Sequence, residues 1–105
     1  MKLIQCIIRP EKLNDIVDKL VAITPGLTIS DVHGHGRKTV TGMYRGVEYR
    51  LLLPSVMIEI LTDDNKVNDL VKILAETART GEIGDGRIFV LPVQESYHVR
   101  TGFMD

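Results

Sequence analysis

The chain has 105 residues, of which 44% are hydrophobic and 26% are charged, and its formal net charge at pH 7 is -1. This length and composition favour one globular domain without room for a second, and they exclude a disordered or fibrous chain. The nearly balanced charge argues against broad electrostatic attraction to nucleic acid or to an anionic membrane.

The first strand is predicted at residues 2–8, which are apolar and rich in isoleucine, as in strands buried on both faces. The lone cysteine, Cys6, lies in this run, which excludes an intramolecular disulfide and predicts a buried thiol. Gln5 interrupts the run and Arg9 closes it, too early for a signal-peptide core or a membrane span. We therefore expect the protein in the cytoplasm.

A helix follows, with Pro10 at a first-turn position. Its apolar face recurs at helical spacing at Leu13, Ile16, Val17, Leu20 and Val21. The alternating residues 27–34 predict a second strand. Residues 36–53 are polar and basic, and Pro54 closes them. Loops of this length are usually functional or mobile, although the lower part of this one could extend the flanking strands as a ribbon.

The third strand is predicted at residues 56–61 and the fourth at residues 87–93. Between them a second helix is predicted to begin at Thr62, where Asp63 and Asp64 complement its dipole. The apolar stripe of this helix is Val67, Leu70, Val71, Leu74 and Ala78.

The order β-α-β-β-α-β predicts an α+β ferredoxin-like domain, with an antiparallel sheet and both helices on one of its faces. In the first and third strands apolar residues point to both faces, although the helices cover only one. The open face would drive association of the chain, so we expect a closed homo-oligomer that packs sheet against sheet. Gln5 and Glu59 fall on this open face and need polar partners there.

Residues 79–90, RTGEIGDGRIFV, place three glycines and an aspartate between the second helix and the last strand. The glycines of residues 84–87 let backbone N–H groups approach a phosphate, and Arg87 adds a forked cationic donor. The segment is no P-loop, because Ile88 stands where a magnesium-binding hydroxyl is required and because the turn runs from helix to strand. The alternative is a plain connection in which Gly81 ends the helix.

Two further arginines strengthen the interpretation as an anion site. Arg37 in GHGR and Arg100 in HVRTG lie at other strand ends. Strand ends of one small fold, or of neighbouring subunits, can converge, and three arginines that converge would repel one another unless an anion bridged them. The sequence therefore predicts an anion site, within one chain or between chains.

The segments ARTGEIGDGRIFVLPV, YRGVEY and IIRPEKL together resemble the PII nitrogen-regulatory signalling family, and the similarity covers nearly the whole chain. The resemblance implies one PII-like domain over residues 1–105 in a homotrimer, with an adenine nucleotide (ATP, ADP or AMP) in each of the clefts between subunits. It implies a T-loop at about 36–54 that contacts a target protein, such as a transporter or a metabolic enzyme, and a B-loop at about 79–87 that wraps the phosphates. It also implies a regulator of nitrogen metabolism.

Matching positions in the family assign residues to the nucleotide. The resemblance places Thr28 and Leu61 at the adenine and Glu59 near the ribose. At the phosphates it places Gly36, Arg37, Lys38, Gly84, Asp85, Gly86, Arg87, His98 and Arg100. Arg87 stands where the family usually has lysine, a replacement that keeps the charge.

Several positions depart from the nitrogen-sensing members of the family. Lys38 replaces a glutamine that helps to hold the magnesium ion bridging ATP and 2-oxoglutarate, and a protonated lysine ligates no metal. Ser55 replaces the lysine that pairs with 2-oxoglutarate, and His98 replaces a phosphate-binding arginine, which favours ADP or AMP over ATP. These departures argue against magnesium-dependent binding of 2-oxoglutarate. Tyr49 matches a tyrosine uridylylated in some relatives, but the following Arg50 favours an unmodified side chain.

Other interpretations are weaker. His33 and His35 would share a strand face, but three histidines and one cysteine argue against a completed transition-metal site. A PII-like sensor of another small anion, such as bicarbonate, with ADP or AMP is one alternative function. A small phosphatase or nucleotide hydrolase on this scaffold is another, although no nucleophile–base pair is evident and we expect no catalysis. An RNA-binding sheet would need exposed aromatic residues, for which Phe89 is the sole candidate.

Overall fold

The computed structural model describes residues 1–34, 40–51 and 53–104 of the chain. The elements run in the order β1 (Lys2–Ile8), α1 (Leu13–Leu20), β2 (Thr28–Gly34), β3 (Val40–Tyr44), β4 (Val47–Leu51), β5 (Leu53–Thr62), α2 (Val67–Ala78) and β6 (Gly86–Pro92). Short 3-10 turns, Pro10–Lys12 and Asp64–Lys66, lead into the two helices. Neither helix of the described segments is long and apolar enough to cross a membrane.

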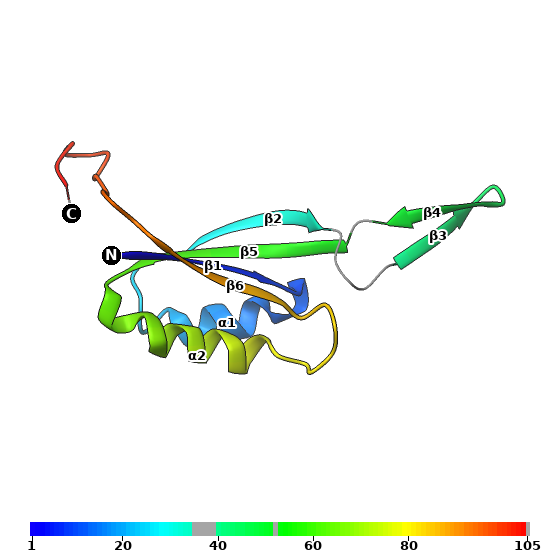
Figure 1. Ribbon diagram of the computed structural model, residues 1–105, viewed down its shortest axis with the longest axis horizontal. Coiled ribbons are helices and arrows are strands. Elements are labelled where there is room, and N and C mark those ends of the chain that lie inside the picture. Colours follow the sequence, from blue (N-terminus) through cyan, green and yellow to red (C-terminus); the bar gives the residue numbers. More distant parts are fainter. Residues whose placement is uncertain (35–39, 52, 105) are drawn as a thin grey trace.

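Four antiparallel strands form one sheet in the order β2-β5-β1-β6, and both helices cover the same face of it (Figure 1). The remaining strands, β3 and β4, pair with each other as a ribbon that projects from one end of the sheet (Figure 1). The predicted ferredoxin-like β-α-β-β-α-β fold is therefore confirmed, with the ribbon inserted between its second and third sheet strands.

The core lies between the sheet and the helices, because alternate residues of β1 and β5 and the apolar stripes of α1 and α2 meet there. Its buried side chains are Ile4, Cys6, Ile8, Ile16, Leu20, Val56, Ile58, Ile60, Leu70, Leu74 and Ala78. Cys6 is 1% exposed, and burial raises the pKa of its thiol to about 11. The prediction of a buried cysteine is confirmed.

The second face of the sheet carries apolar side chains that no helix covers. The register places Gln5 beside Glu59 on one side and Phe89 on the other. The same face carries Leu3, Ile7, Met57, Leu61 and Leu91. Gln5 Nε2 donates a hydrogen bond to the Glu59 carboxylate at 3.1 Å, so these two polar residues in the middle of the face are partners. We call this surface, made of these eight residues, the open sheet face.

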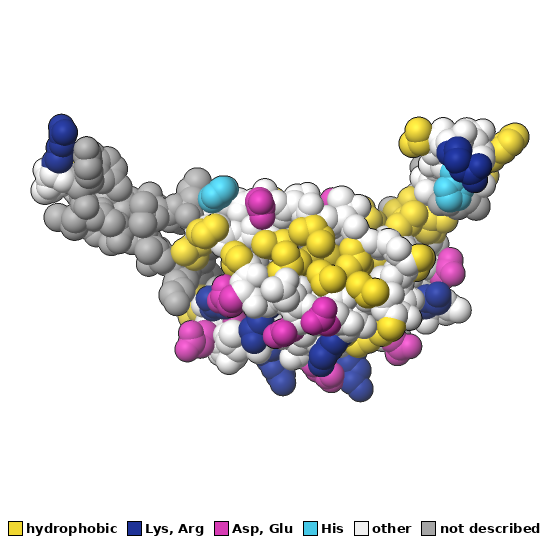
Figure 2. Space-filling view, turned by 180° about the vertical axis from the view of Figure 1, so that it is seen from behind, with side chains coloured by type: hydrophobic (Ala, Val, Ile, Leu, Met, Phe, Trp, Pro, Cys, Tyr) yellow, Lys and Arg dark blue, Asp and Glu magenta, His cyan; other side chains and the backbone are white. Residues whose placement is uncertain are grey.

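The helices, by contrast, present polar side chains outward. The exposed positions of α1 include Asp15, Asp18 and Lys19. In the view from behind, charged side chains form a band over the helices, and hydrophobic side chains gather above this band (Figure 2). The helical layer is therefore suited to face water, whereas the open sheet face is suited to face another protein surface.

The start of β5 differs from the sequence-based prediction. The strand begins at Leu53 and includes Pro54, whereas the sequence predicts that Pro54 closes a loop. Pro54 pairs with His33 of β2, whereas the pairing of β5 with β1 begins only at Val56, opposite Ile8. A proline is tolerated here because at this point β5 has a strand partner on one side only.

The start of the second helix was also predicted wrongly. Thr62 is the buried last residue of β5, the 3-10 turn Asp64–Lys66 follows, and α2 begins at Val67. Thr62 still pairs with Lys2 of β1, and Asp63, with an extended backbone, takes the N-cap position of the 3-10 turn instead. At the other end α2 stops at Ala78, before Gly81, because the backbone of the next residue is already extended.

Candidate anion-binding site

The turn that joins α2 to β6 depends on glycines with a left-handed backbone. The φ angles are 91 at Gly81, 102 at Gly84 and 113 at Gly86, a region that other L-residues rarely adopt. At Gly86 space is a second constraint, because a Cβ atom would lie 1.7 Å from the carbonyl oxygen of Ile7 on β1. Gly86 therefore allows β6 to begin in close contact with the end of β1.

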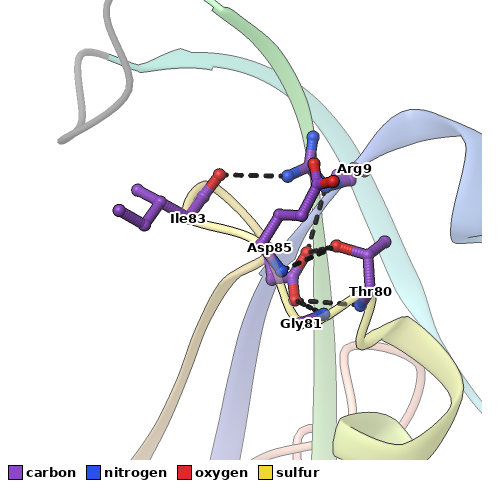
Figure 3. A network of polar contacts seen from close by, with 6 residues as sticks. Arg9, Thr80, Gly81, Ile83 and Asp85 are labelled. Carbon is purple, nitrogen blue, oxygen red and sulfur yellow. Dashed lines mark hydrogen bonds and ion pairs between the residues drawn. The ribbon is translucent and has the colours of Figure 1, made fainter.

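The Asp85 carboxylate closes this turn from within (Figure 3). The backbone N–H groups of Thr80 and Gly81 each donate to it at 2.9 Å, and the Thr80 hydroxyl donates to its second oxygen. Arg9 adds an ion pair, with 3.1 Å between its Nε and Oδ1 of Asp85. These donors, the Thr80 hydroxyl foremost, hold the pKa of Asp85 well below its ordinary value. Asp85 is thus ionised, and its charge is engaged inside the turn.

Arg9 also contacts this turn, although no sequence motif assigns it to the site. Besides its ion pair with Asp85, its Nη2 donates to the carbonyl oxygen of Ile83 at 3.1 Å (Figure 3). The sequence does show a cation directly after the buried first strand. Its role cannot be read from the sequence, because Arg9 is brought to the turn by the pairing of Ile8 with Gly86 in the folded sheet.

The sheet brings one group of predicted residues to a single end. The end of β1, the start of β5 and the start of β6 lie at this end, and β2 also finishes here, at Gly34. Arg87 follows Gly86 here and is exposed. Three further predicted phosphate residues, Gly36, Arg37 and Lys38, lie outside the described residues, as does His35. We call this end the turn end of the sheet.

The other predicted residues lie toward the opposite end, which we call the far end. Thr28 pairs with Glu59, and Leu61 is 41% exposed on the open sheet face. Arg100 is exposed on the C-terminal segment, which leaves the sheet at the far end (Figure 1). A tight turn holds this segment, since the Gly102 N–H donates to the His98 carbonyl at 2.8 Å. Arg87 and Arg100 therefore do not converge within one chain.

Beside the turn a hollow of about 340 Å³ opens between α2 and the start of β6. Apolar side chains such as Leu74 and Ile88 line it together with Arg79 and Arg87. The Asp85 charge is engaged by donors within the turn, so the two guanidinium groups in the lining of the hollow are free to suit an anion, whereas Glu82 is exposed elsewhere in the turn. Among the residues that the structure describes, no group of three or more His, Cys, Asp or Glu side chains could hold a metal ion.

Comparisons with known proteins show the family of the chain. The family model described as Nitrogen regulatory protein P-II matches residues 1–103. The P-II protein of Pasteurella multocida is 46% identical, over 97% of this chain and 94% of the relative. P-II 2 of Methanothermobacter thermautotrophicus is 45% identical over 97% and 91%, and the P-II protein of Synechocystis sp. is 46% identical over 100% and 96%. The chain belongs to the P-II nitrogen regulatory protein family.

P-II proteins are regulatory signal-transduction proteins and not enzymes. The resemblance found from the glycine turn, and the regulatory function that it implied, are therefore confirmed. The phosphatase, hydrolase and RNA-binding alternatives give way to this family assignment.

Replacing Gly86 by alanine should lower the free energy of unfolding by about 3 kcal/mol or more, because the new Cβ overlaps the Ile7 carbonyl oxygen. The matched control is Gly81→Ala, which has a similar φ of 91 but open space around the added atom. This control should cost only about 1–2 kcal/mol, the backbone contribution. Urea unfolding measures both, and equal losses would contradict the close contact between β6 and β1.

The Asp85 carboxylate should make the protein sensitive to acid. Its folded-state pKa is depressed, so its stabilising contribution is complete above the unfolded value of about 3.9 and is lost as the pH falls toward the folded value. Asp85→Asn should be less stable than the wild type at pH 7 and should lose less stability below about pH 4. Urea midpoints across this range measure the difference, and parallel curves for the two proteins would contradict it.

Proposed function

We propose that this P-II protein binds an adenine nucleotide, ATP, ADP or AMP, between neighbouring protomers of a homotrimer and that the nucleotide controls docking onto a target protein. The observation that carries the proposal is the separation of the two residue groups, at the turn end and at the far end of one sheet. A site that needs both groups is completed when the turn end of one protomer meets the far end of the next.

The turn end supplies the groups that suit phosphates. Gly84 and Gly86 leave the backbone accessible, and Arg87 brings a guanidinium that can hold two phosphate oxygens. We place Gly36, Arg37 and Lys38 at the same phosphates, as the resemblance implies, because β2 finishes at this end of the sheet.

The far end of the neighbouring protomer supplies the remaining contacts. Leu61 offers an apolar surface to the adenine, with Thr28 and Glu59 beside it. Arg100 adds a second exposed cation on a segment that extends beyond the sheet, and His98 lies in the same turn. An anion between Arg87 of one chain and Arg100 of the next would offset their mutual repulsion.

The open sheet face supports the assembly. Its Phe89 and Leu91 are 43% and 38% exposed in the single chain, and the Gln5–Glu59 hydrogen bond gives the polar groups in the middle of this face a partner. Three such faces packed together would form the centre of the trimer and leave the charged helices on its outside.

We assign target docking to the T-loop at about 36–54, which contains the ribbon β3–β4. The ribbon turns at Arg45 and Gly46, whose φ angles of 51 and 77 match the tight turns that suit twisted hairpins. The turn lies at the tip of the ribbon, away from the sheet (Figure 1). A nucleotide that prefers one arrangement of this loop would shift the protein toward or away from a target in nitrogen metabolism.

The assembly is tested by placing a charge in the open sheet face. Met57→Lys should yield monomers, because the trimer would have to bury an unpaired ammonium group. The control Asn68→Lys adds the same charge at an exposed position of α2 and should remain a trimer. Light scattering should give about three times the chain mass of 11.8 kDa for the wild type and the control. A monomeric wild type would contradict the proposal.

Sharing of the site between chains is tested by mixing two damaged proteins. Arg87→Ala and Arg100→Ala should each bind ADP more weakly, measured by calorimetry. When the two are unfolded, mixed in equal amounts and refolded, about a quarter of the clefts should combine an intact turn end with an intact far end and recover wild-type affinity. A site contained within one chain would recover none.

The second effector is tested in the same titrations. The exchanges at Lys38 and Ser55 predict that magnesium with 2-oxoglutarate will leave ATP affinity within about twofold of its value without them. ADP and AMP should bind at least as tightly as ATP, because His98 replaces a phosphate-binding arginine. Marked tightening of ATP binding by 2-oxoglutarate would contradict the assignment of Lys38 and Ser55.

A further inference from the structure

The glycine turn contains a negative charge at the position proposed to receive phosphates. Asp85 lies between Gly84 and Gly86, and its carboxylate is ionised. An uncompensated carboxylate there would repel an anionic ligand. Binding of an anion at this turn therefore requires a positively charged group that pairs with the Asp85 carboxylate and holds it away from the ligand.

Arg9 is placed to supply this positive charge. Its guanidinium reaches two parts of the turn at once, with Nε 3.1 Å from Oδ1 of Asp85 and Nη2 3.1 Å from the carbonyl oxygen of Ile83. The two charged side chains are largely shielded from water, with exposed fractions of 20% for Arg9 and 23% for Asp85. The planar guanidinium fits these two acceptors in one fixed orientation, which an ammonium group would not.

The backbone of Arg9 is itself held in place. It directly follows β1, an inner strand of the sheet, and its φ and ψ of -66 and 138 are the extended values that a following proline favours. The Lys12 N–H donates to its carbonyl oxygen at 3.0 Å. The guanidinium thus extends from a fixed point of the sheet to the turn.

The contact with Ile83 also sets the direction of a donor. The carbonyl of Ile83 and the N–H of Gly84 belong to one peptide unit, and in a planar trans unit they point in opposite directions. When Arg9 holds the carbonyl toward itself, the N–H of Gly84 points away from Arg9. This N–H is one of the backbone donors that the proposed function assigns to phosphate.

We propose that Arg9 is a positioning residue for the nucleotide phosphates: it neutralises Asp85 and, through the Ile83 carbonyl, aims the N–H of Gly84 at the ligand. The proposal rests on the nucleotide site proposed above and adds to it a residue that does not itself touch the nucleotide.

A double-mutant cycle on the full-length protein tests this role, with ADP and ATP affinity measured by calorimetry. Arg9→Gln should weaken binding about tenfold or more while Asp85 is present, and less than about threefold in the Asp85→Asn background, because no uncompensated charge is then left. Arg9→Lys should restore part of the loss, since it keeps the charge but not the fork. The control Lys72→Gln removes a positive charge from an exposed position of α2 and should bind as the wild type does.

Hydrogen exchange of the Thr80 and Gly81 amides, which donate to the Asp85 carboxylate, gives a second readout in the ligand-free protein. Arg9→Gln should speed exchange at these amides and leave the amides of β5 unchanged. If Arg9→Gln fails to fold, the same cycle is run with Arg9→Lys, for which the expected loss is smaller.

Three results would overturn the inference. The first is wild-type affinity in Arg9→Gln, and the second is an equal loss with and without Asp85, which would mean that Arg9 does not act through that carboxylate. The third is a wild-type protein that binds neither ADP nor ATP, which would remove the proposed function together with this inference. The first two leave the proposed function standing.

Discussion

The antiparallel pairing of β6 with β1 is the constraint on which the candidate site depends. It places the start of β6 against the end of β1. Gly86 therefore lies so close to the Ile7 carbonyl oxygen that a side chain at position 86 would not fit. The same pairing sends β6 toward the far end, where the C-terminal segment leaves the sheet with Arg100 (Figure 1). Arg87 thus lies at the start of β6, and Arg100 lies beyond its other end. A single chain therefore does not bring these two arginines to one ligand.

Electrostatics inside the turn complement this arrangement. Asp85 collects donors from Thr80, Gly81 and Arg9, so the turn is closed by a carboxylate that faces its own backbone. In the proposed function, the contacts that close the turn are also those that keep the Asp85 charge away from an anionic ligand. The family assignment fits this, because a regulatory protein that responds to a ligand needs a binding surface formed in advance and not a reactive group.

The sequence was sufficient for the fold because its signals are local. Apolar residues with a period of two or of 3.6 identify strands and helices without knowledge of their neighbours, and the two-sided strands revealed the open sheet face. The errors arose where distant pairing decides, as at Pro54, which is tolerated because only β2 lies beside it, and at Thr62, which the sheet keeps extended. The contact between Arg9 and Asp85 joins residues 76 positions apart, which no motif spacing encodes.

The central claim is that one nucleotide touches two chains. A crystal structure of the protein with bound ADP tests it most directly. The account predicts diphosphate oxygens within hydrogen-bond distance of Arg87 and the Gly84 N–H of one protomer, and of Arg100 from its neighbour. A nucleotide whose contacts all come from a single chain, or one bound away from the glycine turn, would contradict it.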